Sequence, residues 1–555
     1  MDSNADHYLR QQEQMEATRG VWEGHWREVA ERVRPSQNLF QQRIRTEGMK
    51  VNERLFDDTA QLALPKFAAA VISMTMPPTQ IYHRIQPSDP GLKKSTAVRR
   101  YLDALNDLLF RVRYRPIANF QAQSSEVVLD IGAFGTGVLF VDDVLGLGIR
   151  YKAFPLAESY ISSDGHGRID TLHRKMQLTA HQAATLFGRE NLPEAITRAL
   201  DQGQNNTKFW FLHCVGPNPE RKPGRMDHTG MAYRATYIAM EQRHTVEQGG
   251  FRSFPFCVPR FETAPREDYG RGPAMKVLPT IKALNEMKKS VIRAAQLAVA
   301  PPIMLEDDGS LRAFSVRSNA LNHGFVKDGR ALAMPFNSGA RVDIGIDLMD
   351  RERDAINDAF FVTLFRILVD EPQITATEAM LRAQEKGQLL APTMGRIQAE
   401  LLGPCVEREI DILAASGTLE AVCGPMPPEL IEQGGEFHLE YQSPLNQAQR
   451  AGTGVAIMNT LNALAPLAQI DPTVQHLPDA HAIFRELAEI NGMPDRLMHS
   501  EDEVIQRAEG EAQQAQAQQL LQAAPVAASA AKDFAQAASM AASAPGQVAP
   551  AILPT

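Results

Sequence analysis

Cysteine, apolar runs of membrane-spanning length and zinc-type motifs are missing or scarce in this sequence. Only 4 of its 555 residues are cysteine, and they lie far apart without a C-x-x-C spacing. This argues against a zinc site or a disulfide framework and suits a reducing compartment. No apolar run approaches the ~18 residues of a membrane-spanning helix, and the opening MDSNADHYLR has no apolar signal core. We therefore expect a protein that works inside a cell or in an assembly made there.

A surplus of basic charge is also missing. The formal net charge is −9, so the chain as a whole is not a generic binder of polyanions, and any contact with nucleic acid must be local. Apolar residues make up 44% of the sequence, which is enough for real cores. The length predicts several domains.

Complete nucleotide-binding motifs are absent. GFVKDGRA (324–331) has the glycine spacing of a P-loop, but Arg330 and Ala331 stand where lysine and a hydroxyl residue are needed. GAFGTG (132–137) has its glycines in the wrong order for a dinucleotide fingerprint, so we interpret them as turn glycines. These near-misses predict no enzymatic activity of this kind.

Candidate metal and hydrolase motifs are equally weak. The 14 histidines form no H-E-x-x-H motif, and His166 and His173 are seven residues apart in β-like chain. No G-x-S-x-G occurs, and the acid pairs at 142–143 and 307–308 lie beside glycine-rich turns. We predict no cofactor and no metal. A nuclease whose acids converge only in space stays open as an alternative.

The N-terminal third reads as helices. Residues 3–34 place Trp22 and Trp26 on one face, where we interpret them as packing anchors, and Pro35 ends the pattern. A small-residue helix follows Asp57-Asp58 and stops at Pro77-Pro78, and 93–130 again look helical.

A β-rich region comes next. The stretches 132–143, 147–176 and 208–216 are rich in glycine, aromatic and β-branched residues and predict antiparallel strands, with a turn around 164–167. MAYRATYIAM and FPFCVPRFE are expected to continue the same sheet, and 179–201 to insert a helix between strands.

The second half alternates between long helices and irregular segments. We expect helix over 273–299, irregular chain over 301–346, and helix over 347–369. After a short connector, the TATE capping box opens a long interrupted helix to about 415. A β-like GGEFHLEYQSP, helices near 447–470 and 479–491, and an Ala/Gln-rich tail complete the chain.

Six stretches together resemble the portal proteins, or head-to-tail connectors, of short-tailed bacteriophages. They are PREDYGRGPAMKVLPTIKALNEMKK, LFDDTAQLALPKFAAAVISMTMPP, FGTGVLFVDD with SDGHGRIDTLHRKM, and TATEAMLRAQEK with RIQAELLGPCVER. The resemblance spans roughly residues 15–495. It implies an α+β subunit with a mostly helical wing and crown, an antiparallel β region in the wing, a two-helix stem and a small α/β clip.

The resemblance also implies how the chain is divided. It assigns 1–270 to the wing, 271–300 to the first stem helix, 301–346 to the clip, 347–369 to the second stem helix, 370–376 to a tunnel loop, 377–445 to the wing's long helix and closing strand, 446–500 to the crown, and 501–555 to a tail that is disordered or forms a helical barrel.

Three sets of residues are the candidate sites. The wing–stem hinge is Tyr269, Gly270, Arg271, Gly272 and Pro273, because glycine permits a tight turn and proline suits a first helical turn. The DNA-facing tunnel loop carries Asp370, Glu371 and Gln373. The stem faces between subunits carry opposite charges that can pair, namely Lys282, Glu286, Lys289 and Arg293 against Asp350, Asp354 and Asp358.

The apolar faces of these two helices are expected to supply most of the adhesion between subunits, since surface ion pairs contribute only about 0–1 kcal/mol each. Those faces carry Val277, Ile281, Leu284, Val291, Ile356, Phe360 and Ile367.

The resemblance implies a ring, usually of twelve copies, at one capsid vertex of the virion, assembled in the host bacterial cytoplasm. Expected partners are the chain itself, the terminase large subunit, major capsid and scaffolding proteins, tail adaptor or nozzle and ejection core proteins, and double-stranded DNA that passes without sequence preference. No membrane partner is expected. The alternatives are another ring-forming head–tail or tail protein and, third, a phage nuclease.

Overall fold

The computed structural model describes residues 3–299 with short gaps at 38, 41–54, 90, 93–94, 145 and 226. Beyond them it describes four short strands within 303–335, then 342–363, most of 392–441, 453–463, 478–490 and a few isolated positions. The statements below concern these residues.

Four helices come first in the chain: α1 (Ser3–Val33), α2 (Thr59–Thr75), α3 (Thr96–Arg113) and α4 (Phe120–Phe134). The single helix expected over 93–130 is wrong, because the chain breaks between α3 and α4, where Pro116 lies. The packing role of the tryptophans is confirmed: Trp26 is fully buried and stacks on Trp22.

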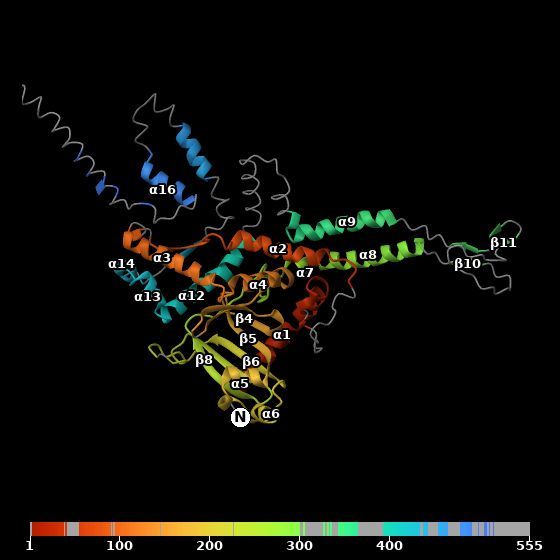
Figure 1. Cartoon of the computed structure of the whole chain (residues 1–555), viewed down its shortest axis with the longest axis horizontal. Helices are drawn as coiled ribbons and strands as arrows, with labels where there is room; N and C mark the ends of the chain where they lie inside the picture. The colour runs from red at the N-terminus through yellow and green to blue at the C-terminus, as the bar shows by residue number, and fades with distance from the viewer. Residues whose placement is uncertain are drawn as a thin grey trace, which may run out of the picture.

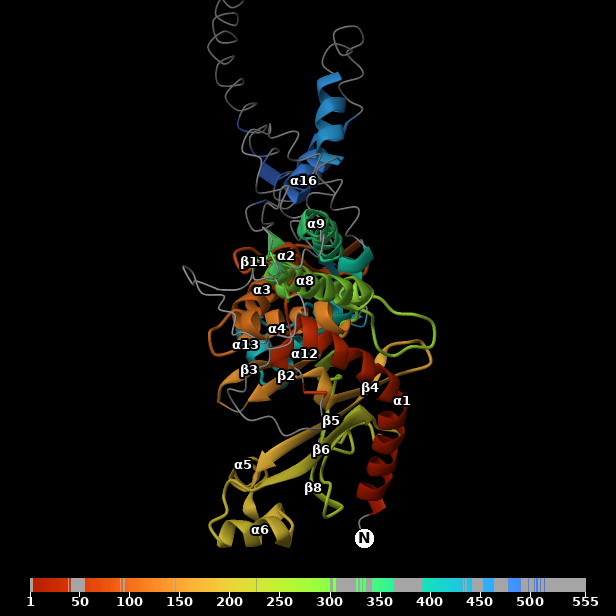
Figure 2. The same ribbon diagram turned by 90° about the vertical axis from the view of Figure 1, so that its right-hand side faces the viewer.

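A five-stranded antiparallel sheet forms the lower part of the molecule (Figure 1), in the order β4 (Ser159–Ser163), β5 (Ile169–Thr179), β6 (Lys208–Pro217), β7 (Tyr233–Ala239) and β8 (His244–Phe251). The helices α5 (Ala180–Phe187) and α6 (Glu194–Asp201) supply apolar side chains to one side of the sheet, and the start of α1 to another cluster on it. Figure 2 shows α1 running down alongside these strands.

Three expectations for this region need correction. Residues 132–134 belong to α4, and the strand β2 (Leu139–Val144) begins only after Gly135 has ended that helix. The expected helix 179–201 is two helices, because Gly188 has a φ of +79° and Pro193 precedes α6. FPFCVPRFE contributes only β9 (Phe256–Cys257), which joins β2 and β3 (Gly148–Ala153) in a separate three-stranded sheet.

Two helices project from the body side by side (Figures 1 and 2): α8 (Leu278–Val299) and α9 (Val342–Ala359). The strands β10 (Ile303–Leu305) and β11 (Val326–Lys327) lie at their far end. β10 pairs with β13 (Ala333–Pro335), and β11 pairs with β12 (Arg330–Ala331).

The first of the two expected long helices is interrupted. Residues 273–276 form a separate turn, α7 (Pro273–Lys276), and α8 starts after Val277. Pro279 explains the break, since it has no N–H to donate to the carbonyl four residues earlier and its ring crowds that carbonyl.

The start expected for the second helix, 347–369, is wrong, because α9 begins five residues earlier, at Val342. α9 ends at Ala359, residues 362–363 are helical again, and 364–369 lie outside the described residues. Phe361 has a φ of +57°, which is unusual for a bulky residue. Phe360 and Phe361 turn into the body, where both contact Phe67, and this packing diverts the chain from the helix axis.

The described C-terminal elements complete the body. A π-helix at Gln398–Leu402 leads into α12 (Gly403–Ala415), followed by α13 (Thr418–Cys423) and α14 (Pro428–Glu432). The strand β14 (Phe437–Tyr441) pairs antiparallel with β1 (His83–Pro87), a strand that the sequence did not predict. One hydrophobic core joins α1 to Leu430, and it includes the inner ends of α8 and α9. Farther on, α16 (Ala480–Ile490) agrees with the helix expected at 479–491.

Candidate functional site

The junction between the body and the projecting helices is built by backbone packed directly on backbone. The loop ahead of α7 brings Gly270 and Gly272 against Gly135, the residue that caps α4. A Cβ at Gly270 would overlap the Gly135 carbonyl, and one at Gly272 would lie 2.6 Å from the Ile131 carbonyl oxygen. Only glycine permits this approach, and Gly135 also has a φ of +79°.

Hydrogen bonds hold the two segments in register. The Gly270 N–H donates to the Thr136 hydroxyl at 2.8 Å, and the Phe261 N–H donates to the Gly135 carbonyl at 2.9 Å. Within the loop, the Arg271 N–H donates to the Glu262 carbonyl at 2.7 Å. These bonds leave the loop little freedom before it enters α7.

Tyr269 and Arg271 fix the loop to α1. The buried Tyr269 ring meets Trp26 edge-on at 5.0 Å, and its hydroxyl accepts a hydrogen bond of 3.2 Å from the Ile161 N–H. Burial raises the pKa of the Tyr269 hydroxyl. The Arg271 guanidinium lies 4.9 Å from the centre of the Trp22 ring and pairs with Glu267 at 2.6 Å. Pro273 occupies the first turn of α7 and is buried. The structure thus brings together, at this junction, all five residues that were predicted to form the wing–stem hinge.

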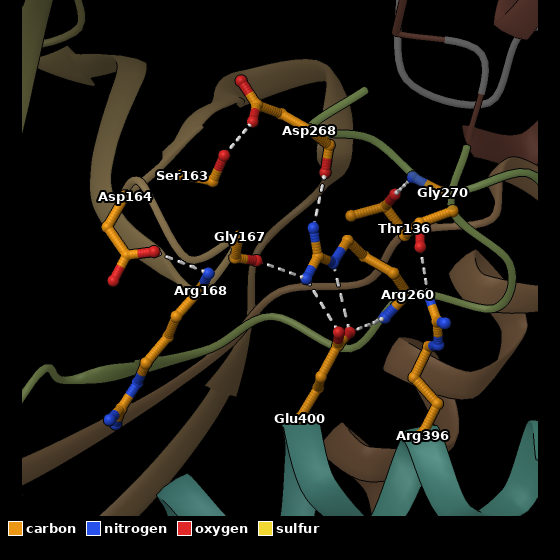
Figure 3. A network of polar contacts seen from close by, with 11 residues as sticks. Thr136, Ser163, Asp164, Gly167, Arg168, Arg260, Asp268, Gly270, Arg396 and Glu400 are labelled. Carbon is orange, nitrogen blue, oxygen red and sulfur yellow. Dashed lines mark hydrogen bonds and ion pairs between the residues drawn. The ribbon is translucent and has the colours of Figure 1, made fainter. Parts of the chain in front are cut away.

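A second set of contacts at the junction was missed by the sequence reasoning (Figure 3). Arg260 forms an ion pair with Glu400 at 2.7 Å and also donates to the carbonyl oxygens of Gly167 at 2.9 Å and Asp268 at 3.4 Å. Glu400 accepts a further bond of 2.8 Å from the Arg260 backbone N–H. Arg396 reaches the hydroxyl of Thr263 from the same helical segment.

The π-helix gives Glu400 its position. Pro404 follows Gly403 and cannot donate an N–H to the Glu400 carbonyl, while its ring would crowd that carbonyl in a regular α-helix. The chain widens by one residue instead, so that the Gly403 N–H donates to the Gln398 carbonyl. The Tyr441 hydroxyl donates to the same Gln398 oxygen at 3.0 Å.

Asp57 ties the middle parts of α8 and α9 to the start of α2. Its carboxylate pairs with Lys288 of α8 at 3.2 Å and with Arg353 of α9 at 3.1 Å. The Thr59 N–H also donates to it at 2.9 Å. Although burial opposes the charge, the combined hydrogen bonds of Thr59, Arg353 and Lys288 lower the pKa of Asp57 to about 2.

The charges predicted for the faces between subunits fall into two groups. Some have partners in their own chain: Lys282 pairs with Glu28, Lys289 with Glu286 at 3.2 Å, and Asp350 with Arg353 at 2.7 Å. Three others are exposed and have no ion-pair partner within the described residues, namely Arg293, Asp354 and Asp358.

The expectation for the apolar faces is wrong for four of its members. Ile281, Leu284, Ile356 and Phe360 lie in the subunit's own core, so they are not free to join another subunit. Ile367 lies outside the described residues. The exposed aliphatic side chains lie instead toward the outer ends of the two helices, at Ile292, Leu297, Val299, Ile344, Ile346 and Leu348.

Other predicted features lie partly or wholly outside the described residues. They are the tunnel loop with Asp370, Glu371 and Gln373, the capping box at Thr375, most of 301–346, and nearly all of 501–555. In the part of the chain that is described, no group of three or more His, Cys, Asp and Glu could hold a metal ion. No described helix is long and apolar enough to span a membrane.

A family model described as bacteriophage head to tail connecting protein matches residues 5–498. The chain belongs to this family. It is 27% identical to the "Probable portal protein" of Bordetella phage BPP-1, over 91% of both chains, and 25% identical to the "Portal protein" of Salmonella phage epsilon15, over 96% of both. It is distantly similar to a solved "Neck of native GTA particle computed with C12 symmetry", with a TM-score of 0.35 and 13% identity, over 72% of this chain and 89% of that one.

Membership confirms the portal prediction made from the sequence. The function is that of a portal, a structural ring at the capsid vertex. The alternatives of a tail protein or a phage nuclease receive no support from these relatives.

Proposed function

We propose that α8 and α9 form the stem that surrounds the channel of a twelve-subunit portal ring, and that the segment between them forms the clip. The carrying observation is that the two helices project together from one packed body with short strands at their tip. Their inner ends belong to the body core, whereas their outer halves expose aliphatic and charged side chains. Such a surface suits neighbouring copies of the same chain.

The junction residues act as an anchor in this proposal. Because Gly135, Gly270 and Gly272 are packed backbone to backbone, the direction of α7 is determined by the end of α4. In a ring, that direction sets the tilt of the stem relative to the wing and hence the width of the channel.

The acidic connector is the proposed contact with passing DNA. Asp370 and Glu371 would repel phosphates and keep the duplex centred, while Gln373 offers weak hydrogen bonds. A lining rich in lysine or arginine would instead hold phosphates through counterion release and impede movement.

The partners follow from this assignment. The clip end binds the terminase large subunit during packaging and tail adaptor or nozzle proteins afterwards. The wing faces the major capsid and scaffolding proteins, and ejection core proteins stack on the head side. Assembly takes place in the host cytoplasm, and the chain itself catalyses no reaction.

A charge reversal tests the channel assignment. We expect the double variant Asp370→Lys/Glu371→Lys to form normal rings and procapsids but to package DNA slowly, with relief at higher salt because phosphate contacts are screened. The matched control is Glu241→Lys/Glu247→Lys, which makes the same charge change at exposed positions beside and within β8. Packaging of the first variant at the parental rate at every salt concentration would refute the assignment.

A further inference from the structure

We propose that the Arg260–Glu400 ion pair is a positioning device that sets the tilt of α8 against the wing sheet and thereby the curvature of the ring. The proposal rests on the assignment of α8 and α9 as the stem. Its chemistry is that of a bidentate clamp between a guanidinium and a carboxylate, whose geometry is fixed because the guanidinium is planar.

Arg260 is the point where three separate parts of the body meet (Figure 3). Its guanidinium donates to the carbonyl of Gly167 in the β4–β5 turn, to the carbonyl of Asp268 in the loop before α7, and to Glu400 in the π-helix. The side chain of Arg260 is only 9% exposed and that of Glu400 22%. The pair is therefore largely protected from competing water.

The backbone at Arg260 is linked by hydrogen bonds to the loop that leads into α7 and then α8. Arg260 forms a β-bridge with Thr136, and the hydroxyl of Thr136 accepts the hydrogen bond of Gly270. The next residue, Phe261, donates to the Gly135 carbonyl. A displacement of Arg260 therefore acts directly on the glycine contact that precedes α7.

The position of Glu400 is itself specified by the sequence. Pro404 favours the π-turn at Gln398–Leu402, and that turn presents Glu400 to both the backbone N–H and the side chain of Arg260. A buried ion pair adds little net stability compared with well-packed apolar residues, because both charges must lose their water. The bidentate pair at this position is therefore better explained by the geometry that it fixes than by the stability that it adds.

The same helix carries a natural control. Glu407 of α12 pairs with Arg168, also in the β4–β5 turn, at 3.3 Å. Both side chains are more than half exposed, and no described hydrogen bond links this pair to the loop before α7. Arg168–Glu407 joins the helical segment to the β4–β5 turn directly, and Arg260–Glu400 does so through the bond from Arg260 to the Gly167 carbonyl. Only Arg260–Glu400 also reaches the junction.

The experiment compares Glu400→Gln and Arg260→Lys with the control Glu407→Gln, each in the full chain. Glutamine keeps the shape of glutamate without its charge, and lysine keeps the charge of arginine without its fork. Purified rings are analysed by native mass spectrometry for subunit number and by electron cryomicroscopy for the angle between α8 and the β4–β8 sheet.

We expect both junction variants to shift the subunit-number distribution away from the single parental value and to change the angle of α8, while the control keeps both. Rings with parental number and angle would overturn the proposal, even if the melting temperature falls. Failure of both junction variants to fold would overturn it too, because a positioning pair must be dispensable for the core. A parental ring in which α8 lies away from the channel would refute the stem assignment separately, since the angle of α8 is measured independently.

Discussion

The inner and outer ends of the projecting helix pair are built on opposite principles. At the inner end, Ile356 and Phe360 are completely buried, and Asp57 satisfies Lys288 and Arg353 together. At the outer end, Ile344 is 52% exposed, and in α9 the exposed aliphatic side chains lie between Asp343 and Asp350. The same two helices therefore serve the fold of one subunit at one end and expose at the other the surface that we propose meets neighbouring subunits.

This difference separates two kinds of substitution. Changes at buried positions of the two helices should act on the unfolding of a single subunit, whereas changes at their exposed positions should act on assembly and leave the subunit folded.

The largest effect is expected at the junction glycines. Gly135→Ala adds a Cβ against the backbone of the loop before α7 at a φ of +79°, so we expect a loss of about 3–4 kcal/mol in the free energy of unfolding. Gly146→Ala is the matched control, because Gly146 also has a φ of +79° but nothing lies within 4 Å of its Cβ position. It should lose only about 1 kcal/mol.

Urea denaturation of the unassembled subunit measures both values. Equal losses in the two variants would mean that backbone conformation, rather than close approach, explains the glycine at 135. The proposal that the packed glycines determine the direction of α7 would then lose its main support.

The next effect contrasts two isoleucines of α9. Ile356→Ala empties a fully buried position, and we expect it to lower the free energy of unfolding by about 3 kcal/mol. Ile344→Ala removes a half-exposed side chain, so the subunit should keep its stability while the concentration needed for ring formation rises. Denaturation and sedimentation velocity separate the two outcomes. If ring formation were unchanged in both variants, the outer face of the two helices would not be an interface.

Local patterns predicted much of the fold. The long α1 helix, the β4–β5 hairpin with its turn after Ser163, and the entry into α7 at Pro273 all depend on residues close together in sequence. Proline and glycine mark their ends, and apolar periodicity marks their faces, so the signal is contained in each segment.

Contacts between distant segments could not be predicted in this way. The β1–β14 pairing joins His83 to Tyr441, and the buried ion pair at 2.7 Å joins Arg113 to Glu409. In a single sequence Arg113 and Glu409 are two separate charged residues, and nothing in the local pattern predicts that they form a pair. The pair Arg260–Glu400 was missed for the same reason, although Gly403-Pro404 could have suggested a widened turn.

The candidate site was predicted unevenly for a related reason. Gly270, Gly272 and Pro273 predict a constrained loop by their residue types alone. Whether the apolar face of α8 packs inward or outward depends on what the rest of the chain places beside it. Helical periodicity shows that a face exists but not which neighbour covers it, and Leu284 is covered by its own subunit.

A smaller effect should follow from the depressed pKa of Asp57. A carboxylate whose pKa is lower in the folded state stabilises the fold above its unfolded pKa of 3.8, and this contribution is lost as the pH falls toward 2. The shift corresponds to about 2 kcal/mol at neutral pH. Asp57→Asn should therefore be less stable at pH 7 and lose less stability between pH 4 and pH 2. Parallel stability–pH curves for variant and parent would contradict the assigned ion pairs.

The smallest effect concerns the exposed acids of α9. Asp354 and Asp358 have no ion-pair partner among the described residues, whereas Asp350 pairs with Arg353 of its own helix. If a neighbouring subunit supplies basic partners such as Arg293, then Asp354→Asn/Asp358→Asn should weaken each interface by about 0–1 kcal/mol per pair. Asp350→Asn should change assembly less, because its partner belongs to the same chain.

Ring formation is followed by light scattering over a range of salt concentrations. The difference between the double variant and the parent should shrink as salt rises, since exposed pairs are screened within about 10 Å at 0.1 M salt. A difference that persists at 1 M salt would mean that shape, rather than charge, makes this face match its neighbour.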